Sequence, residues 1–297
     1  MSGRVTASIV LYNQSAEDMG PLFRELVKQT ALSEWAVVNN GGSEEACAIA
    51  KSLGGQCLHP GRNLGFGAGH NLALRELASD SAPYHLILNP DIRFQGEVLA
   101  ELAAVMDAKP QVGLAMPRVV YPDGSIQRLC KLLPSPVDLV LRRFARELWP
   151  QLFRGRMSRY DMQDFDYSQP ACVPVLSGCF MFCRRSILEF VDGFDERFFL
   201  YMEDTDLCRR MGDISELLFW PFSTVIHSYA QGSYRDLHLL HLHVRSAITY
   251  FNKWGWFHDP IRRERNRIGL TDTDIDPVQI EQLLEGVRAE MEETVLQ

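Results

Sequence analysis

Two acidic segments and one histidine are the parts of this sequence best suited to chemistry. Asp91 stands in LNPDI (88–92), after an apolar run and a proline turn, where a carboxylate can bind a hard divalent cation that bridges two phosphates. His227 follows another apolar run, in TVIHS, and is a second candidate metal ligand. The segment MEDTDLCRR (202–210) places three acids near the expected start of a helix: Glu203, Asp204 and Asp206. Each feature also has a structural alternative, namely a turn aspartate, a turn histidine, or acids favoured by a helix N-terminus.

A glycine-rich stretch, GRNLGFGAGHNLAL at 61–74, raises the question of dinucleotide binding. Gly65 and Gly67 fit the first two positions of a G-x-G-x-x-G fingerprint, but His70 stands where the third glycine belongs. The stretch also follows the third predicted strand, whereas that fingerprint normally follows the first. A Rossmann oxidoreductase is therefore disfavoured, and the glycines are interpreted as permitting a tight turn before a helix that begins at His70.

The elements that position these residues alternate between strand and helix through the first third of the chain. Apolar, β-branched runs predict strands, and runs with apolar residues on one helical face predict helices. The strands are expected within 5–12, 34–43, 56–60 and 84–91, and the helices within 19–30, 43–54 and 70–79. This alternation predicts a mostly parallel sheet flanked by helices. The polar turns after its strands then meet at one edge, where ligands bind in such sheets.

The later part of the chain has a different pattern. The Pro-Asp-Gly turn in VVYPDGSIQRL predicts a hairpin at Asp123-Gly124. A further strand and helix are expected within 173–194. A closing helix is expected at 276–293, with Asp276 as its cap.

The middle of the chain is strongly basic. Between Arg128 and Arg159, eight basic residues outnumber two acids, which gives a local net charge of +6 (eight minus two) in a loop-rich insertion at about 128–165. The insertion is either a solvated surface or a contact for anionic lipid or for a lipid-linked diphosphate.

The composition is that of a globular protein. The 297 residues carry a formal net charge of −8, which argues against nucleic-acid binding. The N-terminal apolar run is too short for a signal peptide, and no stretch has the roughly 18 apolar residues of a spanning helix. We therefore expect a cytoplasmic protein, with the basic insertion as a candidate for peripheral contact at the inner face of the plasma membrane. The seven cysteines are scattered and contain no C-x-x-C pair, so reduced, mostly buried thiols are expected.

The order of these motifs resembles glycosyltransferase family 2, and in particular its bacterial rhamnosyltransferase-like branch. The motifs are N-x-G-F-x-x-G-x-N at 63–71, then LNPD, SGCFMFCRR, GFDERFFLYMEDTDLCRR and VIHS. Their joint pattern is specific and covers about residues 5–255. The resemblance implies an α/β GT-A fold, with a Rossmann-like, mostly parallel sheet and a small antiparallel element. It also implies a nucleotide-diphosphate sugar donor, a Mg²⁺ or Mn²⁺ ion, and inversion at the anomeric carbon.

On this basis we expect residues 1–260 to form a single GT-A catalytic domain and residues 261–297 to form a C-terminal helical tail. Residues 1–95 are expected to be the nucleotide-binding half, and residues 96–260 the acceptor and catalytic half. The acidic tail is suited to pair with a second subunit in a homo-oligomer, or with the basic insertion of its own chain, and the sequence leaves both open.

Carried over position by position, the resemblance assigns roles to the candidate residues. Asp204 matches the general base that takes a proton from the acceptor hydroxyl, a task that needs hydrogen-bond reach and a pKa below the working pH. Asp91 matches the last aspartate of a metal-binding D-x-D-like motif, and Asn89 replaces its first acid on the nucleotide side. His227 matches a further contact to metal or diphosphate. Arg245 falls where this branch has basic residues, and it is a candidate for the diphosphate.

The same resemblance places the two substrates. The nucleoside pocket is expected at residues that follow the first three strands: Tyr12, Asn13, Asn39, Arg62 and Asn63. The family's second strand usually ends in Asp-Asn, but this chain has Asn39-Asn40, so a neutral amide replaces the charge that would accept a hydrogen bond from a pyrimidine base. The hairpin at Asp123-Gly124 is expected to form the rim of the acceptor site. The acceptor itself is expected to contact Ser177, Gly178, Tyr201 and Glu203.

Together these features predict an inverting glycosyltransferase. It would move L-rhamnose from a donor such as dTDP-rhamnose to a hydroxyl of a saccharide or lipid-linked saccharide in cell-surface polysaccharide synthesis. One alternative is the transfer of another sugar, such as galactofuranose, N-acetylglucosamine or glucose. The other, suggested by Asn39 and Asn89 in place of acids, is a catalytically weak assembly protein that binds nucleotide sugars.

Overall fold

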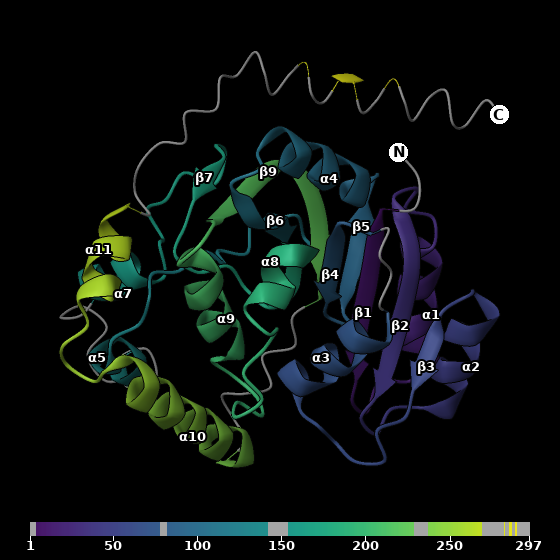
Figure 1. The fold of residues 1–297 in the computed structure, drawn as a ribbon, viewed down its shortest axis with the longest axis horizontal. Coiled ribbons are helices and arrows are strands. Elements are labelled where there is room, and N and C mark those ends of the chain that lie inside the picture. Colours follow the sequence, from purple (N-terminus) through teal and green to yellow (C-terminus); the bar gives the residue numbers. More distant parts are fainter. Residues whose placement is uncertain are drawn as a thin grey trace.

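The fold is built on one mixed sheet with helices packed against it (Figure 1). A computed structural model of the chain describes residues 4–77, 82–141, 154–228 and 237–268, and positions 282, 285, 286 and 289 after them. The predicted closing helix at 276–293, with its Asp276 cap, falls almost wholly outside these ranges. Within them, the sheet has nine strands, in the order β3-β2-β1-β4-β8-β6-β9-β5, and β7 pairs with β9.

The strands are mostly short. They are β1 (Val5–Leu11), β2 (Leu32–Asn39), β3 (Gln56–Leu58), β4 (Tyr84–Leu88), β5 (Ile92–Gln95), β6 (Val112–Val120), β7 (Ala171–Cys172), β8 (Phe180–Arg184) and β9 (Glu216–His227). Every residue of β4 is buried, which is the pattern of a strand covered on both faces of the sheet.

The helices follow the same order along the chain. They are α1 (Ala16–Leu26), α2 (Glu44–Ser52), α3 (Phe66–Glu76), α4 (Val98–Ala108), α5 (Pro136–Val140), α7 (Arg154–Tyr160), α8 (Arg185–Phe190), α9 (Glu203–Gly212), α10 (Leu237–Trp254) and α11 (Pro260–Ile268). The predicted cap of α2 is confirmed, because Ser43 Oγ accepts a hydrogen bond from Ala46 N–H.

The first half of the sheet is parallel, as the alternation of strands and helices predicts. β1 pairs with β2 on one side and with β4 on the other, in registers that align Leu11 with Asn39 and Ile9 with Leu88. The turns after these strands therefore lie along one edge. Antiparallel pairing enters where β8 joins β4 to β6, which accounts for the mixed character of the whole sheet.

The hairpin expected after β6 is confirmed. Val120 and Ile126 form an antiparallel bridge, and Gly124 N–H donates to Tyr121 C=O at 2.9 Å. Gly124 has a φ of +83°, which a glycine adopts without strain. The turn returns the chain toward the end of β9, next to His227.

The predicted start of the third helix at His70 is wrong, because α3 begins at Phe66. Gly67 and Gly69 therefore lie inside the helix and not in a turn. A Cβ at Gly67 would lie 2.8 Å from Phe194 Cβ, and a Cβ at Gly69 would lie 2.8 Å from Val10 Cγ2. These glycines allow α3 to pack closely against its neighbours, so a glycine-rich stretch does not by itself predict a loop.

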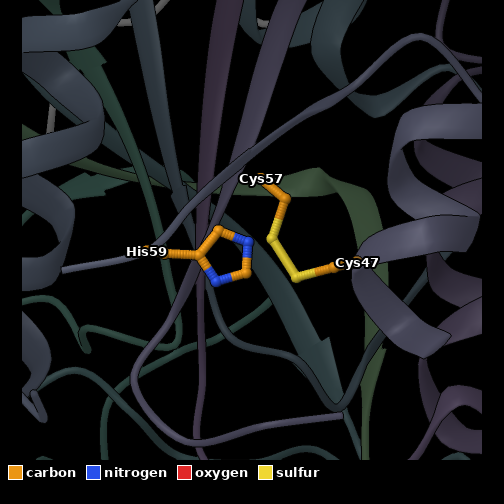
Figure 2. Close-up of side chains that lie close together, drawn as sticks. All are labelled: Cys47, Cys57 and His59. Atoms are coloured by element: carbon orange, nitrogen blue, oxygen red, sulfur yellow. A yellow bond between two sulfur atoms is a disulfide. The ribbon is translucent and has the colours of Figure 1, made fainter. Parts of the chain in front are cut away.

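The expectation of reduced cysteines is wrong for one pair. Cys47 of α2 and Cys57 of β3 form a disulfide, with His59 beside it (Figure 2). The two residues are 10 apart in sequence, and the adjacent packing of α2 and β3 brings their Cα atoms to 5.5 Å. No C-x-x-C spacing marks such a pair, because the contact is made between a helix and a strand. The other described cysteines are free.

The basic insertion contains two short helices, α5 and α7, where the sequence predicted loops. Ser135 caps α5 through its hydroxyl, and Asp138 completes a capping box. Residues 142–153 of the insertion lie outside the described ranges. Every helix in the described part of the chain is too short or too polar to cross a bilayer.

Candidate active site

The structure brings Asp91 and His227 side by side. Asp91 lies in the turn between β4 and β5, and His227 ends β9, where it pairs with Ile92. Asp91 Oδ1 lies 3.1 Å from His227 Nε2, and both atoms are shielded from solvent. Ser228 N–H donates to Asp91 C=O at 3.0 Å, which fixes the two chain segments together. A carboxylate oxygen and an imidazole nitrogen at this separation can bind one divalent cation.

Gln127, which the sequence analysis missed, holds His227 at two points. Gln127 Nε2 donates to His227 C=O at 2.6 Å, and Gln127 Oε1 lies 2.9 Å from His227 Nδ1. A carbonyl can only accept, so the amide orientation is fixed and Nδ1 must carry the proton. With the proton on Nδ1, Nε2 is the ring nitrogen that faces Asp91, and it is the one that can serve as a metal ligand. The sequence predicted the hairpin that precedes Gln127, but it does not show which side chain Gln127 meets.

Asp204 is held in the first turn of α9. Its Oδ2 accepts a hydrogen bond from Gly178 N–H at 3.0 Å, and its Oδ1 accepts one from Thr205 N–H at 2.7 Å. A Cβ at Gly178 would lie only 3.2 Å from Asp204 Cβ, so a larger residue would crowd the carboxylate. Tyr201 and Met202 have φ angles of 70° and 66°, a region that costs a non-glycine residue energy and is often found at functional sites.

One short segment before β8 lies between the two acidic centres. Gly178 N–H donates to Asp204 on one side, and Cys179 C=O accepts from Asn89 N–H at 2.9 Å on the other. Burial raises the pKa of the Cys179 thiol to about 12, and the charges of Asp91 and Asp204 contribute to this rise. Both carboxylates therefore lie close to Cys179.

A cavity of about 190 Å³ is lined in part by Asp204. Three of the predicted acceptor residues line it as well: Ser177, Tyr201 and Glu203. The basic insertion contributes Lys131 and Tyr160 to the lining, and α10 contributes Leu240 and His243. We call this space the acceptor cavity. The fourth predicted residue, Gly178, is not among the described lining residues and instead donates a hydrogen bond to Asp204.

Glu203 and Asp204 are neighbours in different environments. Glu203 lines the acceptor cavity but is only 6% exposed, and among the described residues its Oε2 has no hydrogen-bond partner. The pKa of Glu203 is raised well above its ordinary value, mainly by burial and secondly by the charge of Asp204. Glu203 is thus held toward its neutral form, which can donate a hydrogen bond, whereas Asp204 is half-buried and already receives two.

The predicted nucleoside residues follow β1 and β2 along the open edge of the sheet. Tyr12 is 54% exposed, and Asn13 adopts a φ of 63° in the turn after β1. Asn39 Oδ1 accepts hydrogen bonds from Gly41 N–H at 3.1 Å and from Gly42 N–H at 2.6 Å. The amide oxygen expected to meet a base therefore also organises the turn after β2.

Asn40 is a second residue that the sequence analysis did not single out. Its Nδ2 donates to Gly65 C=O at 2.8 Å, and its Oδ1 accepts from Leu64 N–H at 3.2 Å, so it ties the end of β2 to the glycine-rich loop. Arg62 and Asn63 lie exposed on that loop, and Asn63 Oδ1 accepts from Gly65 N–H at 2.8 Å. These contacts fix the loop at the edge of the sheet.

The glycine-rich loop also contacts the segment that leads to Asp204. Phe66 N–H donates to Phe199 C=O at 3.0 Å. Gly65 has a φ of +84°, and a Cβ there would lie 2.1 Å from the Phe199 oxygen. Gly65 is therefore required for close approach of two backbones, and the loop couples the predicted nucleoside side to the acceptor side.

Arg245 stands apart from these residues. It lies exposed on α10, and it is not among the described residues that line the acceptor cavity. α10 itself is anchored to α9 through the fully buried Asp206, which accepts hydrogen bonds from Lys253 Nζ at 2.9 Å and from Trp254 Nε1 at 2.7 Å. This anchor fixes the wall of the cavity that α10 provides.

The fold and the site together define a glycosyltransferase of GT-A architecture. Residues 6–191 match the family described as Glycosyl transferase family 2, and the chain belongs to this family. The match confirms the resemblance found in the order of the motifs.

Two relatives are similar to this chain over most of its length. It is 28% identical over 240 residues to an N-acetylglucosaminyl-diphospho-decaprenol L-rhamnosyltransferase of Mycobacterium tuberculosis, covering 76% of this chain and 77% of the relative. It is 25% identical over 208 residues to the low-salt glycan biosynthesis hexosyltransferase Agl10 of Haloferax volcanii, covering 68% of this chain and 60% of the relative.

Solved structures share the fold. The mannosyltransferase PcManGT from Pyrobaculum calidifontis, in complex with GDP-Man and Mn²⁺, superposes with a TM-score of 0.57 at 15% identity, covering 100% of this chain and 76% of that one. GalNAc-T7 with UDP, GalNAc and Mn²⁺ superposes with a TM-score of 0.59 at 14% identity, covering 96% of this chain and 54% of that one. These similarities confirm the predicted GT-A fold.

Proposed function

We propose that the chain is a metal-dependent, inverting rhamnosyltransferase that uses a nucleotide-diphosphate donor and a lipid-linked saccharide acceptor. The observation that carries the proposal is the placement of two centres on either side of the segment before β8. Asp91 and His227 lie on one side, and Asp204 lies on the other beside a cavity. The named activity of the mycobacterial relative supports rhamnose as the sugar and a diphosphate-linked lipid as the acceptor.

The donor half of the site is assigned to residues 1–95. The residues that would contact the nucleoside are Tyr12, Asn13, Asn39, Arg62 and Asn63. The turn after β2 already engages Asn39 Oδ1, so a bound base would meet an amide that is fixed in place. A fixed polar group is not reoriented on binding, which reduces the entropic cost.

Asp91 and His227 fit a divalent cation, because a hard carboxylate oxygen and an imidazole nitrogen suit Mg²⁺ or Mn²⁺. Asn89 precedes them on the nucleotide side. A bound cation would neutralise the charge that develops on the departing nucleoside diphosphate, so no protein acid is needed there. Arg245, which lies exposed on α10, stays the candidate for a contact with the diphosphate.

The chain's own residues carry the proton transfer. Asp204 takes the proton of the acceptor hydroxyl as that oxygen bonds to the anomeric carbon, and the carbon–oxygen bond to the diphosphate breaks. Attack from the face opposite the leaving group inverts the anomeric centre. The hydrogen bonds from Gly178 and Thr205 keep the carboxylate in one orientation, and Glu203 donates to an acceptor hydroxyl from the cavity wall.

Binding and transfer test this proposal separately. Thermal shifts with dTDP, UDP and GDP in the presence of Mn²⁺ identify the base, and dTDP should raise the melting temperature most. Transfer from dTDP-rhamnose to N-acetylglucosaminyl-diphospho-farnesol, followed by mass spectrometry, identifies the reaction. Stabilisation by UDP or GDP alone would assign a different donor. Stabilisation without transfer to any acceptor in a panel of sugars would favour a nucleotide-sugar-binding protein.

A further inference from the structure

A second cavity, of about 670 Å³, lies among α5, α7 and α11 and is rich in arginine. We call it the arginine pocket. Its five arginines come from α7 and α11: Arg156, Arg159, Arg262, Arg263 and Arg267. Among the described lining residues the one acid is Asp138. Figure 1 shows α5, α7 and α11 at one side of the molecule and α2 and β3 at the opposite side.

Three of the five arginines have no carboxylate partner among the residues that the structure describes. Asp138 is engaged by Arg156, whose Nε donates to it at 2.7 Å. Over residues 4–77, 82–141, 154–228 and 237–268, no carboxylate pairs with three other arginines of the pocket, which are Arg159, Arg263 and Arg267. Arg263 and Arg267 are four apart on α11, a spacing at which like charges repel. An anion in the pocket would offset this repulsion.

The pocket is firmly built. Asn266 of α11 accepts from Leu133 N–H at 2.8 Å and donates to Leu133 C=O at 3.0 Å. Arg262 is buried and donates to Pro134 C=O at 3.2 Å. These bonds fix α11 against the start of the basic insertion, so Arg263 and Arg267 are held at the pocket before any ligand arrives.

The arginine pocket adjoins the acceptor cavity. Tyr160 lines both spaces. Lys131 lines the acceptor cavity, and the next two residues, Leu132 and Leu133, line the arginine pocket. A ligand that extends past Tyr160 would therefore have one end beside the acids of the acceptor cavity and the other end in the arginine pocket.

We propose that the arginine pocket binds the diphosphate of a lipid-linked acceptor whose terminal sugar lies beside Asp204. The inference rests on the proposed function and adds a location for the charged part of the acceptor. Arginine suits this ligand, because its planar guanidinium can donate two parallel hydrogen bonds to phosphate oxygens. The donor is assigned to a different part of the molecule, because β1 and β2, which lead to the predicted nucleoside residues, lie away from α7 and α11 (Figure 1).

The double variant Arg263→Gln/Arg267→Gln tests the proposal, with Arg24→Gln/Lys28→Gln as a control of equal charge change on exposed residues of the opposite half. Two acceptors are compared, N-acetylglucosaminyl-diphospho-farnesol and octyl N-acetylglucosaminide, which has no phosphate. Loss of charge-assisted hydrogen bonds should raise the KM of the double variant for the diphosphate acceptor about tenfold or more. Its KM for the octyl glycoside and its thermal shift with dTDP should match those of the wild type.

Two results would overturn the assignment: an unchanged KM for the diphosphate acceptor, and an equal rise in KM for both acceptors. If the KM is unchanged and co-sedimentation with phosphatidylglycerol vesicles is lost, the pocket is assigned to membrane lipid instead. Arg159→Gln gives a second, single-residue measurement with the same expected direction. If the wild type transfers sugar to neither acceptor, the proposed function itself fails, and the thermal shift with dTDP shows whether donor binding fails with it.

Discussion

The contrast between Glu203 and Asp204 predicts that removing the ionisable carboxyl of Glu203 changes the pH dependence of stability and leaves kcat nearly unchanged. Glu203 is buried, and its raised pKa means that the folded protein keeps its proton at pH values where the unfolded chain, with an ordinary pKa of 4.5, has released it. The folded state therefore binds more protons than the unfolded state in that range. Stability from this group is complete below pH 4.5 and is lost as the pH rises toward the folded-state pKa.

Glu203→Gln replaces the protonated carboxyl by a neutral amide of the same shape and removes this linkage. One proton difference corresponds to about 1.4 kcal/mol of unfolding free energy for each pH unit. The variant should therefore gain about that much relative to the wild type for each unit above pH 4.5, up to the folded-state pKa. Near pH 4.5 the two proteins should be of similar stability, within about 1 kcal/mol.

Urea denaturation at a series of pH values measures the difference, and transfer assays accompany it. Because the amide can still donate to an acceptor hydroxyl from the cavity wall, Glu203→Gln should keep kcat within about tenfold of the wild type. Asp204→Glu, which keeps the charge, is a control for crowding near Gly178. A constant stability difference across the pH series would show that Glu203 is ionised in the folded protein and would refute the reasoning.

Three further predictions concern stability and the metal pair. His85 is buried, and burial together with the charge of Arg185 lowers its pKa from 6.5 to about 3. On acidification the unfolded chain therefore takes up a proton before the folded protein does, and the folded protein loses stability between these two pH values. His85→Gln should remove about 1.4 kcal/mol of this loss for each pH unit, measured by urea denaturation. Cys47→Ser should lower the stability by about 2–3 kcal/mol in non-reducing buffer, and the difference from the wild type should vanish with a reductant. Gln127→Leu should weaken Mn²⁺ binding, measured by electron paramagnetic resonance, by about tenfold, whereas Gln169→Leu at an exposed position should not; equal affinities would remove Gln127 from the site.

The sequence was sufficient for features that depend on local pattern. Alternating apolar runs predicted the parallel half of the sheet, and Ser43 with its following acids predicted the start of α2. Family-specific motifs predicted the fold and the family. Asp91 and His227 were grouped only by the resemblance, yet they lie 3.1 Å apart because β5 pairs with the end of β9.

The sequence was insufficient where distant elements decide the outcome. Gly67 and Gly69 looked like loop residues, but their small size serves the packing of α3 against Phe194 and Val10. Gln127 acts on His227 across 100 residues of sequence, which no spacing rule reveals. The arginines of α11 meet those of α7 only in the folded chain.

The central claim is that Asp204 is the base of a sugar transfer whose nucleotide donor is bound by other residues, and one pair of measurements tests it directly. Asp204→Asn keeps the shape of the side chain but cannot take a proton. Loss of the general base should lower kcat for transfer by about 10²–10⁴-fold. Affinity for dTDP with Mn²⁺, measured by calorimetry on the same preparation, should equal that of the wild type. Transfer by Asp204→Asn at the wild-type rate would contradict the account.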